Sequence, residues 1–167
     1  MDRFERLASA LRRIPGLEVR ENEPMKRHTT FRIGGPARLM ALPRSRKEAA
    51  AAVRAATEAG IAPFFLGNGS NLLVADHGYE GFVLKACGLD QVREVNRRLR
   101  AESGITLARL ANAALGRGLT GLEFAHGIPG TLGGAVVMNA GAYGGEMVQV
   151  LTAVTYLDGA GEEHTLP

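Results

Sequence analysis

Residues 121–145 read GLEFAHGIPGTLGGAVVMNAGAYGG, and this stretch decides how the rest of the sequence is interpreted. Solvent-exposed linkers combine glycine with serine and charged residues, whereas here glycine alternates with large apolar residues. Glycine-rich backbone with apolar neighbours is typical of main chain that approaches another group closely. A second glycine loop, GNGSN at 67–71, follows another apolar run. Two such loops in one short chain predict a large ligand that is held by main-chain N–H groups.

The composition limits the class of protein. The chain has 167 residues, enough for one domain or for two small domains that share an interface, and 46% of them are apolar. Aromatic residues make up 5% and tryptophan is absent, which argues against base-stacking platforms for nucleic acid. A net charge of +3 favours capture of an anionic ligand such as a diphosphate.

The single cysteine and the four histidines carry little chemistry of their own. Cys87 ends an apolar run, and we expect a buried, inert thiol. No two histidines are spaced as metal ligands on one helix, so we expect no metal. No basic-then-apolar leader and no long apolar run is present, which predicts a cytoplasmic protein that does not enter a membrane.

Apolar periodicity predicts an alternation of helices and strands. Helices are expected over 3–13, 45–59, 106–115 and 133–139, strands over 37–42, 61–66, 72–74 and 81–84, and hairpins over 92–101 and 151–166. Strand, helix and strand over 37–66 predict a βαβ unit with a parallel strand pair. Residues 20–30 are polar and are expected to form an extended arm. The last strand has no closing element before Pro167, so we expect this part of the fold to be incomplete.

The GNGSN loop follows the carboxyl end of a predicted strand, where ligands of α/β sheets commonly bind. It lacks the Gly-Lys-Ser/Thr of a Walker A motif, and no helix follows it as in the dinucleotide fingerprint. Gly67 and Gly69 permit positive φ, Asn68 and Asn71 tolerate it, and Ser70 adds a hydroxyl donor. These properties predict an anion nest, and a plain tight turn between strands is the alternative.

The long glycine stretch has two parts. In the first, Pro129 fixes a turn and Thr131 is expected to cap a short helix whose first N–H groups point at an oxyanion. In the second, residues 139–144 offer one amide, several small residues and the phenol of Tyr143. A flat aromatic ring could lie against such small side chains, and a purely structural role is equally open. His126 borders this glycine-rich stretch and His28 borders the Thr29-Thr30 turn, each as a ligand contact or as a packing residue.

Three motifs in one order carry a resemblance. They read MKRHTTFRIGGPA at 25–37, LGNGSNLL at 66–73, and GLEFAHGIPGTLGGA with MNAGAYG at 121–135 and 138–144. Together they resemble the UDP-N-acetylenolpyruvoylglucosamine reductases, flavoenzymes that make UDP-N-acetylmuramate for bacterial peptidoglycan. The resemblance implies an α+β fold of two FAD-binding subdomains of the vanillyl-alcohol-oxidase type. Residues 1–84 would form the first subdomain and residues 85–167 the second.

The resemblance also implies the site. FAD would lie between the subdomains, with its diphosphate on 67–71, its flavin beside 127–135, and the arm that carries Thr30 closed over it. Tyr143 would border the substrate. The residues expected to bind FAD are Thr30, Gly67, Asn68, Gly69, Ser70, Asn71, Gly127, Ile128, Pro129, Gly130, Thr131, Gly133, Gly134, Ala135, Asn139 and Gly141.

In the reaction of that family, NADPH reduces the flavin, which passes the hydride to the enolpyruvyl group of the UDP-sugar. The catalytic arginine, serine and glutamate of the family lie in segments that this sequence does not contain, so we assign no catalytic residue. Two other functions stay open: a non-catalytic flavin-binding module, and another oxidoreductase on the same fold, such as an alcohol or sugar oxidase. The oligomeric state is also open.

Overall fold

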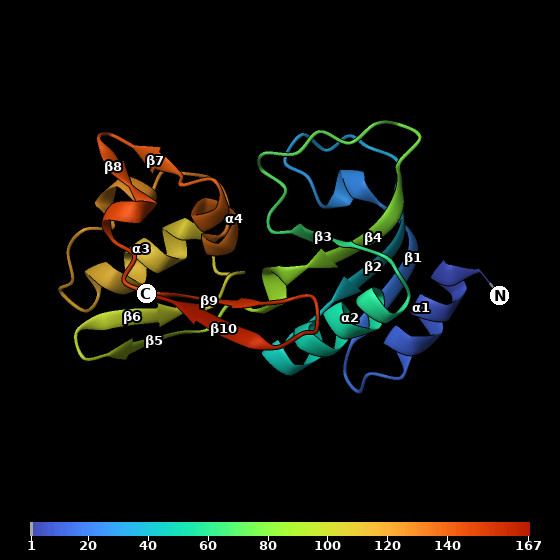
Figure 1. Ribbon diagram of the computed structural model, residues 1–167. Coiled ribbons are helices and arrows are strands. Elements are labelled where there is room, and N and C mark those ends of the chain that lie inside the picture. Colours follow the sequence, from blue (N-terminus) through green and yellow to red (C-terminus); the bar gives the residue numbers. More distant parts are fainter. Residues whose placement is uncertain (1) are drawn as a thin grey trace.

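The computed structural model describes residues 2–167, which form two lobes (Figure 1). The first lobe contains α1 (Arg3–Arg12), β1 (Glu18–Pro24), η1 (Met25–Arg27), β2 (Pro36–Leu42), α2 (Arg46–Glu58), β3 (Pro63–Leu66), β4 (Tyr79–Lys85) and η2 (Ala86–Gly88). The second contains β5 (Val92–Val95), β6 (Arg98–Ala101), α3 (Leu107–Leu115), η3 (Glu123–Ala125), α4 (Leu132–Val137), β7 (Gly141–Ala142), β8 (Gly145–Glu146) and η4 (Met147–Gln149). The hairpin of β9 (Val154–Leu157) and β10 (Glu163–Leu166) follows.

The first lobe is a four-stranded sheet in the order β1-β2-β4-β3. β1 runs antiparallel to β2, and β2, β4 and β3 run parallel. The apolar faces of α1 and α2 pack with the sheet in the main core. Both helices begin as the sequence predicts, because the side chain of Asp2 accepts from the Phe4 N–H and that of Ser45 accepts from the Glu48 N–H.

The strands of the predicted βαβ unit, β2 and β3, run parallel in one sheet, but they are not neighbours, because β4 lies between them and pairs with both. β4 is buried from Gly81 to Leu84 and suits the interior of the sheet, whereas Phe64 and Phe65 of β3 are exposed, as an edge strand permits. Residues 72–74 form no strand; Leu72 and Val74 pack instead with Met25 in a small cluster on the sheet.

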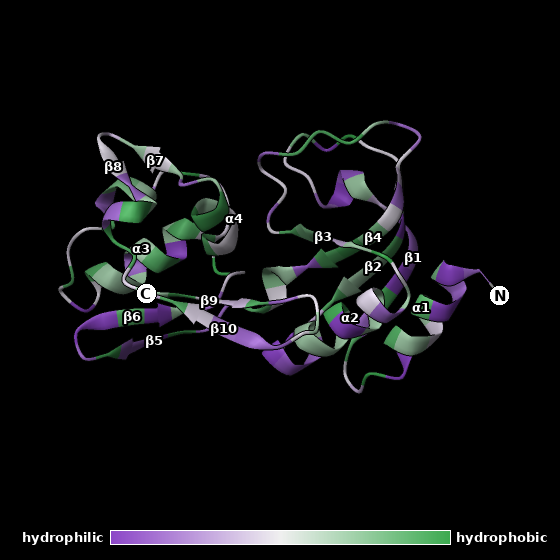
Figure 2. Ribbon diagram, viewed as in Figure 1, coloured by the Kyte–Doolittle hydropathy of each residue, from purple (hydrophilic) through white to green (hydrophobic). Residues whose placement is uncertain are grey.

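The segment predicted as a polar arm is only partly free of the sheet. Its first half is β1, which pairs with β2 along its length. Residues 27–32, which follow, are called the arm below. Figure 2 shows that the strands at the centre of this lobe are mainly apolar, while the exposed helix faces are hydrophilic.

The second lobe forms around α3 and α4. Thr106 caps α3, whose residues Leu107, Leu110, Ala111 and Ala114 are buried. Leu115, the last residue of the helix, is 76% exposed. The β5–β6 hairpin turns at Asn96 and Arg97 with φ of 50° and 57°.

The β9–β10 hairpin packs against the first lobe. Its turn lies on α2, where Thr57 Oγ1 donates to Gly159 O over 2.6 Å and Arg54 Nε donates to Ala160 O over 3.1 Å. Leu157 packs against the main core of the first lobe. The hairpin therefore ties the end of the described chain to α2 (Figure 1).

Candidate cofactor site

The two glycine loops meet at the junction of the lobes. Ser70 Oγ, in the first glycine loop (67–71), donates to Pro129 O of the second glycine loop (127–135) over 3.0 Å. A Cβ atom on Gly67 would lie 2.2 Å from Thr131 Oγ1, so the backbone of one loop touches a side chain of the other. The structure thus brings together the two segments that the sequence singled out.

The first glycine loop keeps main-chain donors available. Within residues 2–167, the N–H groups of 68–71 donate to no protein acceptor. Gly69 has φ of +65°, whereas Asn68 and Asn71 do not adopt positive φ. Unpaired N–H groups next to a left-handed residue fit an anion nest. Thr30 N–H donates to Gly69 O over 3.1 Å, which closes the arm onto this loop.

A pocket of about 350 Å³, here called the cationic pocket, lies between the arm and the first glycine loop. Three basic side chains line it, and no carboxylate does. Sequence reasoning missed these basic residues, although two of them stand inside the MKRHTTFR motif. The lining residues are Arg27, His28, Thr29, Thr30, Arg32, Asn68 and Lys85.

A second pocket of about 290 Å³, here called the loop pocket, lies beside the second glycine loop. No acidic residue, arginine or lysine lines it. A Cβ on Gly127 would meet no atom within 4 Å, so this backbone is open to close approach by a ligand. The lining residues are Asn68, Thr106, Ala108, His126, Gly127, Ile128, Pro129 and Gly130. Asn68 therefore borders both pockets.

A chain of polar side chains lies behind the cationic pocket. His28 Nδ1 lies 2.9 Å from Lys85 Nζ, and His28 Nε2 lies 2.8 Å from Glu23 Oε1, which also accepts from Arg20. An ammonium can only donate, so Nδ1 accepts from Lys85 and the proton on Nε2 is donated to Glu23. His28 and Glu23 are both buried.

Burial shifts the pKa of two basic groups at this pocket. It lowers the pKa of His28, despite its hydrogen bond to Glu23, and it lowers the pKa of Lys85. Burial alone would raise the pKa of Glu23, but hydrogen bonds from His28 and Arg20 outweigh it and hold the pKa below its usual range. Cys87 is half-buried, which raises the pKa of its thiol.

The expectation for the start of α4 is wrong. The side chain of Thr131 makes no capping hydrogen bond. The N–H groups of Leu132 and Gly133 donate to Ile105 O and Ser103 O, both over 2.8 Å. The first two N–H groups of this helix are thus used within the lobe and are not free for an oxyanion.

Several predicted contacts of the long glycine stretch have structural partners in the second lobe. A Cβ on Gly133 would lie 2.8 Å from Ser103 Cβ, and one on Gly141 would lie 2.7 Å from Gly145 O. Asn139 donates to Glu146 Oε2 and accepts from the Val148 N–H. Ala135 is buried in the core of this lobe, whereas Gly134 is exposed.

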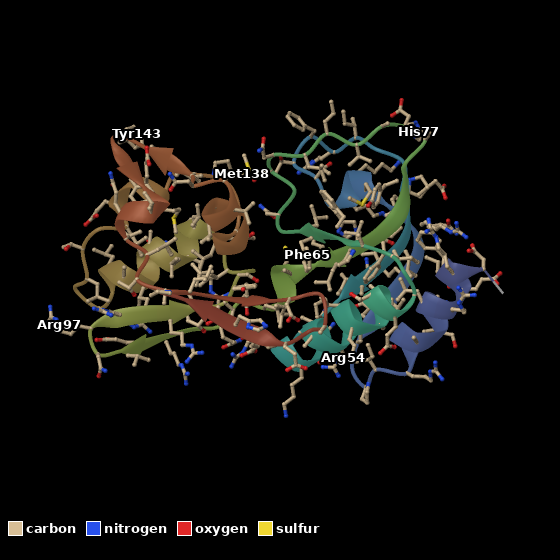
Figure 3. All side chains as sticks on the ribbon, viewed as in Figure 1. Arg54, Phe65, His77, Arg97, Met138 and Tyr143 are labelled. Carbon is tan, nitrogen blue, oxygen red and sulfur yellow. The ribbon has the colours of Figure 1, made fainter. Side chains whose placement is uncertain are left out.

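Tyr143 lies on the turn between β7 and β8, at the tip of the second lobe (Figure 3). Its side chain is 95% exposed, and the residue has φ of 53°. It lines neither pocket. Any contact with a substrate would therefore form outside the two pockets at the junction.

The profile of the family described as "FAD binding domain" matches residues 37–167, most of the chain. The chain belongs to the FAD binding domain family. Its cofactor is FAD, as the sequence motifs predicted.

Two curated relatives of this FAD binding domain are UDP-N-acetylenolpyruvoylglucosamine reductases. The protein of Caldanaerobacter subterraneus subsp. tengcongensis is 53% identical over 137 residues, which cover 82% of this chain and 45% of that protein. The protein of Clostridium kluyveri is 40% identical over 163 residues, which cover 97% of this chain and 54% of that protein. The chain therefore spans about half the length of these relatives.

Solved structures show the same fold. The UDP-N-acetylenolpyruvylglucosamine reductase of Thermus caldophilus superposes with a TM-score of 0.71 at 36% identity, covering 90% of this chain and 52% of that one. The glucooligosaccharide oxidase of Acremonium strictum gives a TM-score of 0.71 at 18% identity, over 96% of this chain and 36% of that one, and shows the fold alone. The prediction of a two-subdomain α+β fold of the vanillyl-alcohol-oxidase type is confirmed.

No helix within residues 2–167 has the length and apolar character needed to cross a membrane. In the same described part of the chain, no three His, Cys, Asp or Glu side chains gather as ligands for a metal ion.

Proposed function

We propose that this chain is the FAD-binding part of a UDP-N-acetylenolpyruvoylglucosamine reductase, which reduces its UDP-sugar to UDP-N-acetylmuramate with NADPH in the cytoplasm. The observation that carries the proposal is the meeting of the GNGSN loop with the GIPGT segment across the junction of the lobes. Relatives of that name, 40% to 53% identical in sequence, support it.

In this proposal FAD spans both pockets past Asn68. The free N–H groups of 68–71 take the diphosphate, and the arm that carries Thr30 covers it. The isoalloxazine ring occupies the loop pocket, where the open backbone at Gly127 allows close contact. The cationic pocket on one side of Asn68 carries positive charge, and the loop pocket on the other side has no Arg or Lys. This difference matches a ligand with one anionic part and one flat aromatic part.

FAD, when bound, supplies the hydride-transfer chemistry between the nicotinamide and the enolpyruvyl group. The described residues bind and orient the cofactor. In this proposal Tyr143, exposed at the tip of the second lobe, contacts the UDP-sugar from outside the two pockets. The groups that act on the substrate itself belong to the remaining half of the relatives' length.

The test has two stages. The purified chain is titrated with FAD, and binding is followed by quenching of flavin fluorescence; absence of saturable binding would refute the assignment of the cofactor site. The full-length protein is then assayed for NADPH oxidation that depends on UDP-N-acetylenolpyruvoylglucosamine. Rapid oxidation of an alcohol or sugar instead, with no turnover of the UDP-sugar, would favour the oxidase alternative.

A further inference from the structure

The cationic pocket gathers basic side chains that no carboxylate of the described protein contacts directly. Arg27, Arg32 and Lys85 all line it, and within residues 2–167 none of the three forms an ion pair with a carboxylate. Elsewhere in the chain, most arginines that form ion pairs do so at the surface, such as Arg54 with Glu162 and Arg46 with Glu163. Three cations at one pocket without a carboxylate create a field that an anionic ligand would neutralise.

Lys85 differs from the two arginines because its position is fixed. Arg27 and Arg32 are exposed, whereas Lys85 is half-buried at the carboxyl end of β4. Its ammonium donates to His28 Nδ1 over 2.9 Å, and buried Glu23 holds the opposite side of the ring. A lysine normally loses much rotamer freedom when it binds a ligand, and here the protein has already restricted that freedom.

The backbone of the arm also shows a feature typical of binding turns. Arg32 has φ of 57°, a left-handed conformation that is uncommon for arginine. The Arg32 N–H donates to Thr29 O, and Thr29 Oγ1 donates to Ile33 O, so the turn is held from both sides. Conformations of this kind persist where the surroundings enforce them and cluster at ligand clamps.

We propose that Lys85 is the central cation of the FAD site, held by a His28–Glu23 pair so that its ammonium binds the diphosphate of the cofactor. The proposal rests on the proposed function, since it assigns the anion within that same site. Lys85 binds the ligand, and His28 and Glu23 are positioning residues. The N–H groups of 68–71 contact the same diphosphate from the side of the first glycine loop.

The test compares two ligands that differ in the diphosphate. FAD and riboflavin share the isoalloxazine ring, but riboflavin has no phosphate. In Lys85→Met we expect FAD to bind at least tenfold more weakly, while riboflavin affinity changes less than twofold. Lys47→Met is the matched control, because Lys47 is exposed on α2 and lines neither pocket. Inorganic pyrophosphate should displace FAD from the wild type, and less effectively from Lys85→Met.

A pH series adds a readout that a purely structural role would not move. Burial lowers the pKa of Lys85, so the ratio of FAD to riboflavin affinity should fall as pH rises through that lowered pKa. Lys85→Arg should keep FAD affinity and move this decline to higher pH, because guanidinium stays charged. The charged and titratable groups that face Lys85 are Arg20, Glu23, His28, Arg27, Arg32 and Cys87.

A positioning role for His28 is tested by two variants. His28→Leu removes the acceptor for Lys85 and should weaken FAD severalfold, while His28→Asn offers an oxygen near the place of Nδ1 and should recover most of that loss. Melting curves exclude unfolding as the cause. Equal losses in both variants would overturn the positioning role.

The outcomes separate the two proposals. If the wild type binds neither FAD nor riboflavin, the proposed function fails. If it binds FAD and Lys85→Met binds FAD equally well, the function stands and the role of Lys85 is overturned. If Lys85→Met still binds FAD but its FAD-loaded form no longer binds UDP, the cationic pocket binds the diphosphate of the UDP-sugar. That result also overturns the proposed role of Lys85.

Discussion

Gly69 offers a sharp test of how the arm and the first glycine loop fit together. A Cβ on this residue would lie 2.1 Å from His28 O and 2.9 Å from Thr29 Cα, and its φ is +65°. Both neighbours are backbone atoms, so no side-chain rotation relieves the clash. We therefore expect Gly69→Ala to push the arm away from the loop and break the hydrogen bond from Thr30 N–H to Gly69 O.

A matched control separates the clash from the cost of the left-handed backbone. Gly60 has φ of +66°, and an added Cβ there meets nothing within 4 Å. Both substitutions bear the left-handed penalty of about 1–2 kcal/mol. Only Gly69→Ala adds the cost of overpacking, about 1–3 kcal/mol. We expect Gly69→Ala to lower the free energy of unfolding by about 1–3 kcal/mol more than Gly60→Ala does.

Urea denaturation measures both variants, since the slope m should stay the same and the midpoints should differ. FAD titration gives the second readout: Gly60→Ala should bind like the wild type, and Gly69→Ala should lose most of its affinity because the arm no longer closes. Equal midpoints for the two variants would refute the packing argument. Unchanged FAD affinity in Gly69→Ala would show that the arm does not contact the cofactor.

Three further outcomes follow from the same site. Ser70→Ala removes the 3.0 Å hydrogen bond to Pro129 O and should cost about 0.5–1.5 kcal/mol in urea denaturation, and a loss below 0.2 kcal/mol would show that this contact does not join the loops. Gly127→Leu places a side chain at the loop pocket without positive φ, so FAD titration should show about tenfold weaker binding (about 1.4 kcal/mol) while the urea midpoint stays unchanged. Hydrogen bonds hold the folded-state pKa of Glu23 below its usual range, so its contribution to stability is present above the unfolded pKa and is lost as pH falls through the folded pKa. Glu23→Gln should flatten this part of the curve of unfolding free energy against pH. An unchanged curve would contradict the assigned hydrogen bond to His28.

Much of the fold could be predicted from the sequence because it is locally encoded. The cap residues Ser45 and Thr106 mark the starts of α2 and α3, and the Asn96–Arg97 turn joins two alternating strands. These signals act over a few residues. The strand order could not be predicted, because periodicity does not say which apolar strand becomes fully buried. The insertion of β4 between β2 and β3 depends on packing across the whole lobe.

The sequence singled out the two loops that the structure brings together, but it could not say which single residues face a ligand. A position needs glycine when another group approaches its backbone closely, whether that group is a ligand or a neighbouring protein atom. The sequence cannot distinguish these two cases. Gly67 meets Thr131, and Gly133 meets Ser103, so protein packing already explains both glycines. Lys85 was missed for the opposite reason. A lysine at the end of an apolar run resembles a solvated strand end, and its partner His28 lies 57 residues away in sequence.

The direct contacts between the lobes are modest, and this bears on the proposed position of the cofactor. The hairpin is tied to α2 partly by exposed ion pairs, Arg54 with Glu162 at 3.3 Å and Arg46 with Glu163 at 3.2 Å, each worth about 0–1 kcal/mol. At the glycine loops, the side-chain hydrogen bond between the lobes is that of Ser70. A ligand that fills the pockets on both sides of Asn68 contacts both lobes at once, so its binding free energy adds to these modest contacts. With the free N–H groups and the unpaired cations at this junction, FAD bound as proposed would be part of what holds the two lobes together.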